Sequence, residues 1–438
     1  MRETMVADTG AVDPGVEKRM RAEWNERAQE DAHYYVAFGR RDQDDEEFYA
    51  TAKALVGELA AELKRLPAAD SGPRRALEIG CGPGRLLRPM SRYFAEIHGV
   101  DVSDAMVTLA KEKLRDVPHA FPHAIGGSDL RLFPDAYFDF VYSYAVFQHI
   151  PSGEVVFSYL RETVRVLKPG GVARLQLNGL PKSSRAYTTW EGVRISADEM
   201  HSFAREHGVQ LLALTGIESQ YMWMTWRKPT GGAVSAAGAC RIRAVSNAFS
   251  SEQAVPANGR LACIAASVEN LPETCDLNTL TALVDGKPGR ICYVGPCGSN
   301  GFSQVNIFLP PGVRTGMVPL QFELHGESLC PAKSVRVIQP GPAVPRLTAI
   351  SDAINLMSPQ RIESGLIKIS IEEVDDIAGF QATVDGVTAD HVETFRADPL
   401  TERWEINFGI PKGTAPGGHV LEIRLGERLL TRMGIEVI

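Results

Sequence analysis

The sequence lacks any apolar run near the roughly 18 residues that a membrane-spanning helix needs. Its opening residues, MRETMVADTGAVDPG, lack the apolar core of a secretory signal peptide. Positive charge is not in excess, because 54 Asp and Glu residues outnumber 46 Lys and Arg residues. We therefore expect a cytoplasmic protein without a membrane partner. We do not expect a nucleic-acid partner either, since proteins that bind nucleic acid usually present a basic face.

Cysteine is scarce and unevenly placed. The chain has seven cysteines in 438 residues, and six of them lie between positions 240 and 330. In the absence of an export signal, buried free thiols are a better interpretation than a set of disulfides. Cys292 and Cys297 form one closely spaced pair, but no second Cys or His pair accompanies them. We therefore expect neither a zinc site nor any other metal site.

The first half of the chain alternates two kinds of apolar pattern. Helical spacing predicts helices over residues 16–31 and 46–66, and then over 85–94, 105–115 and 154–167. Short apolar runs predict strands over 76–79, 97–100, 138–144 and 171–178. Strands that alternate with helices indicate a parallel sheet with helices on both faces. The sequence thus predicts an α/β doubly wound (Rossmann-like) domain over residues 1–230, with a helical segment at its N-terminus.

Helical patterns nearly vanish after a Pro/Gly/Ala linker at residues 228–239. Short strand patterns separated by turn residues predict two all-β sandwiches, over 238–340 and 346–438. The two segments repeat each other, since Val284-Asp285-Gly286 parallels Val384-Asp385-Gly386 about 100 residues later. They resemble immunoglobulin-like domains of the TIG/IPT kind. Neither segment contains a recognisable catalytic constellation.

A glycine-rich turn follows the first predicted strand. It reads Glu78-Ile79-Gly80-Cys81-Gly82-Pro83-Gly84 and opens a predicted helix. Glycines let a ligand approach the bare backbone, and a helix N-terminus offers unpaired N–H groups to an anion. The glycine spacing departs from the G-x-G-x-x-G fingerprint of dinucleotide-binding folds, so an NAD enzyme is disfavoured.

This turn resembles motif I of class I S-adenosylmethionine-dependent methyltransferases, and the resemblance extends in order over about residues 18–228. It implies S-adenosyl-L-methionine as the cofactor. Asp101, after the second strand, would bind both ribose hydroxyls, which match the two oxygens of a carboxylate. Glu78 would reach the methionine amino group, directly or through water. The resemblance implies a cofactor site made of Glu78, Gly80, Cys81, Gly82, Gly84, Asp101, Val102, Met106, Asp129, Leu130 and Tyr144. Within it, Val102, Met106, Asp129 and Leu130 would surround the adenine.

Other residues are candidates for handling the methyl acceptor. His149 follows the fourth strand of the family pattern and is a candidate general base, or else a histidine that packs its loop. Gln148 and Asn178 lie where strands end, the edge at which such sheets bind ligands. The segment WNERAQEDAHYY at residues 24–35 resembles a segment of related bacterial methyltransferases that folds over the cofactor, with Tyr34 and Tyr35 as lid candidates, or it is an ordinary packed helix.

These features leave three functional hypotheses. The first is methyl transfer to a small-molecule or sugar-like acceptor by in-line displacement. The second is a methyltransferase that its β-sandwiches recruit to a protein or a glycan. The third is a non-catalytic binding or scaffold protein that retains the cofactor fold. Because the edge strands of β-domains must be covered, charged or paired, we also expect a homodimer contacted through the C-terminal domains.

Overall fold

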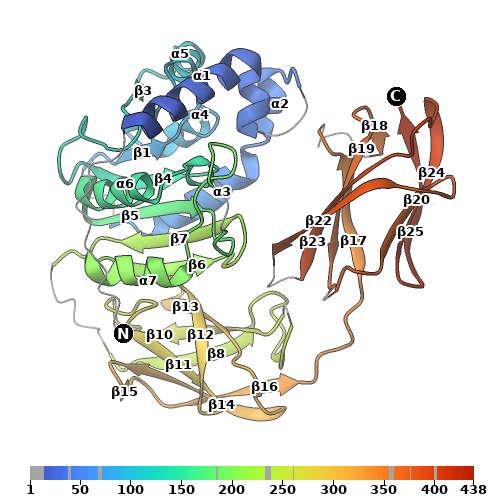
Figure 1. Ribbon diagram of the computed structural model, residues 1–438. Helices are drawn as coiled ribbons and strands as arrows, with labels where there is room; N and C mark the ends of the chain where they lie inside the picture. Colours follow the sequence, from blue (N-terminus) through green and yellow to red (C-terminus); the bar gives the residue numbers. More distant parts are fainter. Residues whose placement is uncertain are drawn as a thin grey trace, which may run out of the picture.

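The computed structural model describes residues 14–37, 41–67, 72–183, 186–231, 238–259, 261–354, 360–374, 376–398 and 402–438. The chain forms an N-terminal α/β domain followed by two all-β units (Figure 1). The first all-β unit lies directly against the α/β domain, and the second is set to one side. No helix of the described ranges is long and apolar enough to cross a membrane.

The α/β domain is built on one seven-stranded sheet. Its strand order is β3-β2-β1-β4-β5-β7-β6, and β7 runs antiparallel to both of its neighbours. This confirms the predicted doubly wound fold. Its strands are β1 (Arg75–Ile79), β2 (Glu96–Asp101), β3 (Ala120–Ala124), β4 (Phe138–Ser143), β5 (Leu167–Leu177), β6 (Gln210–Thr215) and β7 (Met222–Arg227).

Helices cover both faces of this sheet. They are α1 (Pro14–Ala37), α2 (Asp45–Ala50), α3 (Lys53–Glu62), α4 (Leu87–Met90), α5 (Asp104–Lys113), α6 (Gly153–Val166) and α7 (Ala197–Glu206), with short 3₁₀ turns η1 (Leu63–Arg65), η3 (Ser91–Tyr93) and η4 (Phe147–His149). Ser152 caps the N-terminus of α6, because its hydroxyl accepts a hydrogen bond from the Val155 N–H. Its apolar side joins the larger of two cores, and α3 and α4 close the other.

Three elements differ from the predicted pattern. The predicted helix over 46–66 is divided into α2 and α3, and α1 extends to Ala37 across a non-helical Asp31 (φ −167°, ψ 90°). The prediction missed β3, which contains Pro122 and alternates buried with exposed side chains. β3 is the outermost strand, where a proline is tolerated because its missing N–H faces no partner.

The first all-β unit comprises β8 (Arg241–Asn247), β9 (Ala254–Pro256), β10 (Cys263–Glu269), β11 (Leu280–Val284), β12 (Lys287–Val294), β13 (Phe302–Phe308), β14 (Gly316–Leu324), β15 (Glu327–Ser328) and β16 (Lys333–Ile338). It meets the α/β domain along β6, the edge strand. The Leu277 N–H donates to the Leu211 carbonyl (2.8 Å), and Tyr293 pairs with Ala213. The β6 edge, which would otherwise offer unpaired backbone groups, is thereby covered.

The second all-β unit comprises β17 (Arg346–Asp352), β18 (Arg361–Ile362), β19 (Leu366–Glu372), β20 (Phe380–Val384), β21 (Val387–Thr388), β22 (Asp390–Asp398), β23 (Arg403–Gly409), β24 (Gly417–Leu425) and β25 (Arg428–Val437). Its strand order β17-β19-β23-β22 matches β8-β10-β13-β12 of the first unit. The repeated turns also match, since Asp285 (φ 54°) and Asp385 (φ 49°) both precede a left-handed glycine. Six of the seven cysteines are buried free thiols, whereas Cys297 is exposed, which differs from the expectation.

Candidate active site

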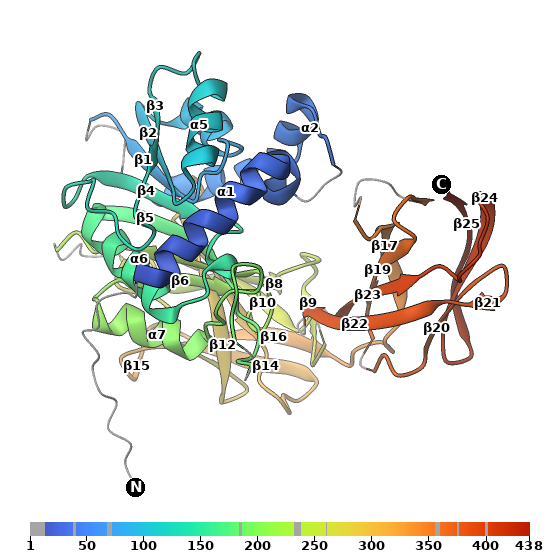
Figure 2. The ribbon, with the colours of Figure 1, turned by 45° about the horizontal axis from the view of Figure 1, so that its top comes forward.

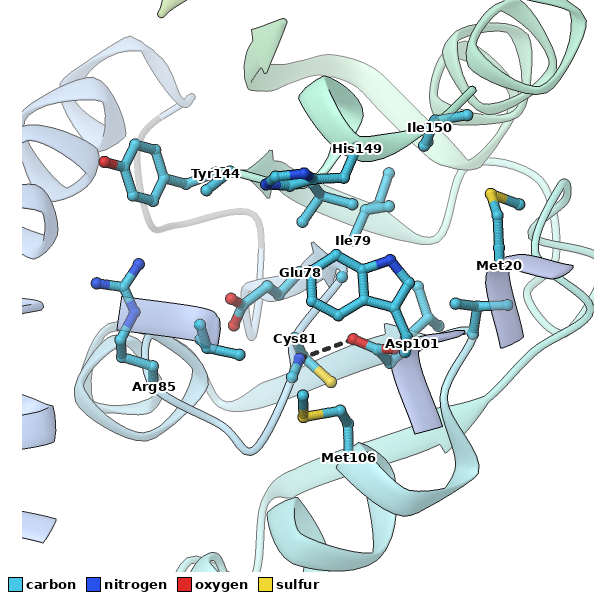
Figure 3. Close-up of a pocket in the computed structure, with 18 of the residues that line it drawn as sticks. Met20, Glu78, Ile79, Cys81, Arg85, Asp101, Met106, Tyr144, His149 and Ile150 are labelled. Atoms are coloured by element: carbon cyan, nitrogen blue, oxygen red, sulfur yellow. Dashed lines mark hydrogen bonds between the residues drawn. The ribbon is translucent and has the colours of Figure 1, made fainter. Parts of the chain in front are cut away.

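A pocket opens at the carboxyl ends of β1, β2 and β4, the edge at which doubly wound sheets bind ligands. It is bounded by the turn after β1, the loop after β4 and the helix α1. In Figure 3, Arg85 and Tyr144 lie at one end of the pocket, and Met20 and Ile150 lie at the other. Glu78, Cys81 and Asp101 lie between them.

The glycine turn forms the floor of the pocket. Gly80, Gly82 and Gly84 have φ angles of 72°, 51° and 90°, in the left-handed region that favours glycine. A Cβ atom on Gly80 would lie 2.2 Å from a methyl carbon of Val146, in the loop after β4. The turn can therefore approach that loop only because position 80 has no side chain.

Asp101 lies at the end of β2 and faces the glycine turn. Its Oδ2 accepts from the Gly82 N–H at 2.8 Å, and its Oδ1 accepts from the Ser103 N–H at 2.9 Å. Burial raises the pKa of Asp101, and the two backbone N–H groups act in the opposite direction. Each oxygen keeps a further lone pair for a ligand hydroxyl. Val102 and Met106 line the same wall.

Glu78 and Arg85 bring an acidic and a basic side chain into the pocket. Both are buried, with exposed fractions of 3% and 6%. Burial raises the pKa of Glu78 well above its usual range, and the Tyr142 hydroxyl donates to its carboxylate at 3.1 Å. Arg85 donates from Nη1 to the Thr51 hydroxyl at 3.3 Å, while its buried Nε has no partner in the described part of the chain. The guanidinium therefore still has hydrogen-bonding capacity for a ligand.

Helix α1 closes the pocket from above and lies beside α5 (Figure 2). Asn25 fixes it there, because its Oδ1 accepts from the Ser103 hydroxyl (2.7 Å) and the Ala105 N–H (3.2 Å). Trp24 and Tyr35 project from α1 into the pocket lining. Tyr34 is absent from that lining, and the cation of Arg41 lies 4.0 Å from the centre of its ring.

His149 lies under this lid with both ring nitrogens engaged. Its Nδ1 is 3.0 Å from the Trp190 carbonyl oxygen, and its Nε2 is 3.2 Å from the Gln148 amide nitrogen. The Trp24 ring packs edge-on, 5.4 Å away between centroids. Burial is the main cause that lowers the pKa of His149 to about 4. The imidazole is thus neutral at pH 7, and this geometry favours the packing interpretation over that of a free base.

Titration of His149 should make stability depend on pH. The folded-state pKa of about 4 lies below the unfolded value of about 6.5, so the contribution is complete above pH 6.5 and is lost as pH falls toward 4. The change is on the order of 2–3 kcal/mol. Urea unfolding of the wild type and of His149→Gln between these pH values should show a flatter dependence for the variant. An unchanged dependence would assign the acid sensitivity to other groups.

Residues 77–175, which contain the turn, Asp101 and β4, match the family model described as Methyltransferase domain. The α/β domain is a class I S-adenosylmethionine-dependent methyltransferase domain. Its cofactor is S-adenosylmethionine, as the resemblance to that family implied. The residues present fit that group, because a two-oxygen carboxylate, a side-chain-free turn and a buried acid–base pair share one pocket.

Several curated methyltransferases resemble the methyltransferase domain over part of their length. Phosphoethanolamine N-methyltransferase 2 of Caenorhabditis elegans is 33% identical over 105 residues, 24% of this chain and 23% of that protein. Trans-aconitate 2-methyltransferase of Rhodopseudomonas palustris is 34% identical over 117 residues, 26% and 42% of the two chains. The chain thus spans less than half the length of these relatives. A solved geranyl diphosphate C-methyltransferase of Streptomyces coelicolor shares 15% identity over 50% of this chain and 100% of its own, with a TM-score of 0.38.

Some predicted residues of the methyltransferase domain lie outside the pocket lining. Asp129 pairs with Arg131 (3.0 Å), and Leu130 is buried in the core, whereas nearby Gly127 lines the pocket instead. Asn178 binds backbone groups of its own loop, and Gln148 reaches His149 rather than the pocket. Gly84 shapes the turn from behind the lining.

Arg85 is a charged residue of the pocket lining that the sequence analysis did not single out. It lies in the segment 85–94, whose apolar spacing predicted a helix and no binding role. The signal available was its position directly after the last glycine of the turn, where a helix N-terminus and a ligand meet.

Proposed function

We propose that the chain transfers the methyl group of S-adenosylmethionine to a small-molecule or sugar-like acceptor by in-line displacement. The observation that carries this proposal is the enclosure of one pocket by the glycine turn, Asp101 and the docked lid α1. An acceptor that shares this enclosed space must be small or must insert a narrow group.

The residues of the chain would align the reactants and exclude water. The cofactor supplies an activated methyl group on a sulfonium. The protein's main contributions to catalysis would therefore be to align the two reactants and to exclude water. Trp24 and Met20 cover the pocket, while Tyr35 and Tyr144 line it with aromatic surface suited to a ring-shaped acceptor.

Titration calorimetry with the full chain tests the cofactor part of the proposal. S-adenosylhomocysteine should bind and NAD should not. Binding of NAD alone would overturn the proposal. Incubation with labelled S-adenosylmethionine and a set of small hydroxyl, amine and carboxylate acceptors then tests the transfer step. Binding of the cofactor without transfer to any acceptor class would favour the scaffold hypothesis.

Arg85 would bind the carboxylate of the cofactor's amino-acid part, opposite Glu78, which would bind its ammonium. Arg85→Met should weaken S-adenosylhomocysteine binding about 10-fold or more, the loss expected for a charge-assisted hydrogen bond. Binding of 5′-methylthioadenosine, which has no amino-acid part, should not change. Calorimetry measures both ligands. Arg88→Met is the matched control, because Arg88 pairs with Asp116 at the surface.

Two other outcomes for Arg85 would be informative. Equal losses for both ligands would mean that Arg85 only supports the fold. Unchanged binding of both, with a raised KM for a carboxylate acceptor, would assign the guanidinium to the acceptor.

We propose that the two all-β units are immunoglobulin-like sandwiches of the TIG/IPT kind with a role in assembly or recruitment. Their matching strand orders and matching Asp-Gly turns support this, as does the lack of a His/Cys/Asp/Glu cluster within the ranges described. Recruitment to a protein or a glycan remains the alternative role for the same surfaces.

We propose a homodimer that pairs through β22. β22 is an edge strand, and its Val392 and Phe395 expose 46% and 49% of their surface. Light scattering at micromolar concentration should show a dimer, and Phe395→Lys should give a monomer because a charge on an edge opposes strand pairing. Phe249→Lys, at an exposed turn of the first unit, should remain dimeric. A monomeric wild type would refute the dimer.

A further inference from the structure

A second cavity lies between the methyltransferase domain and the first all-β unit, at the edge of the sheet opposite the cofactor pocket. It measures about 380 Å³. The methyltransferase domain contributes the end of η1, the start of β5 and the end of β7. The all-β unit contributes the loop between β10 and β11 and the end of β12. Neither domain forms this cavity alone.

Arg65 lines the cavity, and one nitrogen of its guanidinium group has no hydrogen-bond partner among the described residues. Only 3% of its side chain is exposed. Its Nε pairs with Glu62 at 2.5 Å, and its Nη1 donates to the Val294 carbonyl at 2.7 Å. Its Nη2 is buried and has no partner in the described part of the chain. The contacts to Glu62 and Val294 explain how Arg65 joins the two domains, but they leave Nη2 unexplained, and an unpartnered buried donor is costly.

Two further cations face the same cavity. Arg227, from the end of β7, donates from Nη2 to the Glu273 carbonyl at 2.9 Å and from Nε to the Gln210 amide oxygen at 2.9 Å. Burial lowers the pKa of Arg227, the Glu273 carboxylate raises it, and the charge of Arg65 lowers it. Lys64 is exposed at the rim.

The charge of the cavity is unbalanced. Glu273 is the one carboxylate among its described lining residues, against three cations. Glu62 is already paired with Arg65. Three cations against one lining carboxylate leave net positive charge facing the cavity, and a bound anion would offset that charge. A phosphate group suits this arrangement, because it carries up to two negative charges and its oxygens accept several guanidinium hydrogen bonds at once.

We propose that this interdomain cavity is a binding site for a phosphate group, held by Arg65 Nη2, Arg227 and Lys64. The ligand is inorganic phosphate or the phosphate of a small phosphorylated molecule, for which the remaining volume leaves room. Because the three cations face a wall made by the all-β unit, the bound anion stabilises the contact between the two domains. The site lies away from Asp101 and the glycine turn, so it is a second site rather than part of the cofactor pocket.

Calorimetry with the full chain at constant ionic strength tests the site, with inorganic phosphate and glucose 6-phosphate as separate probes, neither of which carries the adenosine of the cofactor. Wild-type chain should bind at least one of them. Arg227→Met and Lys64→Met should each weaken that binding about tenfold or more, while leaving S-adenosylhomocysteine binding unchanged. Binding should raise the unfolding temperature, and the rise should grow with the logarithm of the ligand excess over Kd. Preference for glucose 6-phosphate would identify a phosphorylated molecule as the ligand, and preference for phosphate would identify the free ion.

The control is Arg205→Met, because Arg205 also lies at the domain contact but donates to Asn278 outside the cavity. It should bind the probe as the wild type does. Arg65→Met should abolish binding, and since Arg65 also holds Val294, the exposed Lys64 variant provides the test that cannot be confused with misfolding. Absence of binding by both probes, or wild-type affinity in the Arg227 and Lys64 variants, would overturn the proposal.

Discussion

Replacing Asp101 with alanine should weaken S-adenosylhomocysteine binding roughly 10- to 100-fold, because charge-assisted hydrogen bonds contribute about 1.5–3 kcal/mol. The carboxylate is buried at the end of β2 and already accepts from the Gly82 and Ser103 N–H groups. Its loss would remove the expected contacts to both ribose hydroxyls and also the bond to the Gly82 N–H that holds the glycine turn. Titration calorimetry measures the change.

Asp101→Asn separates these two effects. The amide keeps an oxygen that can accept from the Gly82 N–H, but it has no charge and offers only one oxygen to the ribose diol. Its affinity should therefore fall between those of the wild type and the alanine variant. Asp116→Ala, at an exposed ion pair with Arg88, should bind as the wild type does. Wild-type affinity of Asp101→Ala would show that Asp101 only shapes the turn.

Replacing Gly80 with alanine should destabilise the chain by about 2–5 kcal/mol and abolish measurable cofactor binding. A left-handed residue with a side chain costs about 1–2 kcal/mol, and overpacking adds about 1–3 kcal/mol. Gly80 has φ 72°, and the added carbon would lie 2.2 Å from a Val146 methyl. Urea unfolding measures the stability, and calorimetry measures the binding.

Two companion variants make this result interpretable. Gly80→Ala combined with Val146→Ala removes the clash but keeps the unfavourable backbone, so it should recover only part of the loss. Gly57→Ala is the matched control, because a Cβ atom at Gly57 of α3 meets nothing within 4 Å. It should stabilise the chain by about 0.5–1 kcal/mol, since alanine favours a helix. A neutral Gly80→Ala would mean that the loop after β4 can move away.

The predicted helices and strands were confirmed where neighbouring residues in the chain carry a clear apolar pattern. β1, β2, β4 and β5 lie where the short apolar runs predicted strands, because most of their residues are buried in a sheet covered by helices on both faces. β3 was missed because an edge strand with a proline carries a weak pattern. The break between α2 and α3 was missed because both halves have apolar residues at helical spacing.

The site shows the same division. Glu78, Gly80, Gly82 and Asp101 gather in one pocket because each follows directly from the end of a parallel strand, so chain order nearly fixes their place. Asp129 and Leu130 do not line it. They lie in the connection between β3 and β4, where no strand end fixes the direction of a side chain. Asp129 turns toward Arg131, and Leu130 turns into the hydrophobic core.

The sequence by itself determined the doubly wound domain, its cofactor, the glycine turn and the position of Asp101. The domain and the turn depend on short-range features, namely hydrophobic period, glycine spacing and the order of strand ends, and the cofactor followed from the resemblance of these motifs to a known family. Only the tertiary structure decided which charges are buried without a partner. Arg85 meets the cofactor pocket, and Arg65 and Arg227 meet a cavity shared with the all-β residues from Leu271 onward, which are distant in the chain. The burial of a charge is a property of everything packed around it, and that surrounding is assembled from segments far apart in sequence.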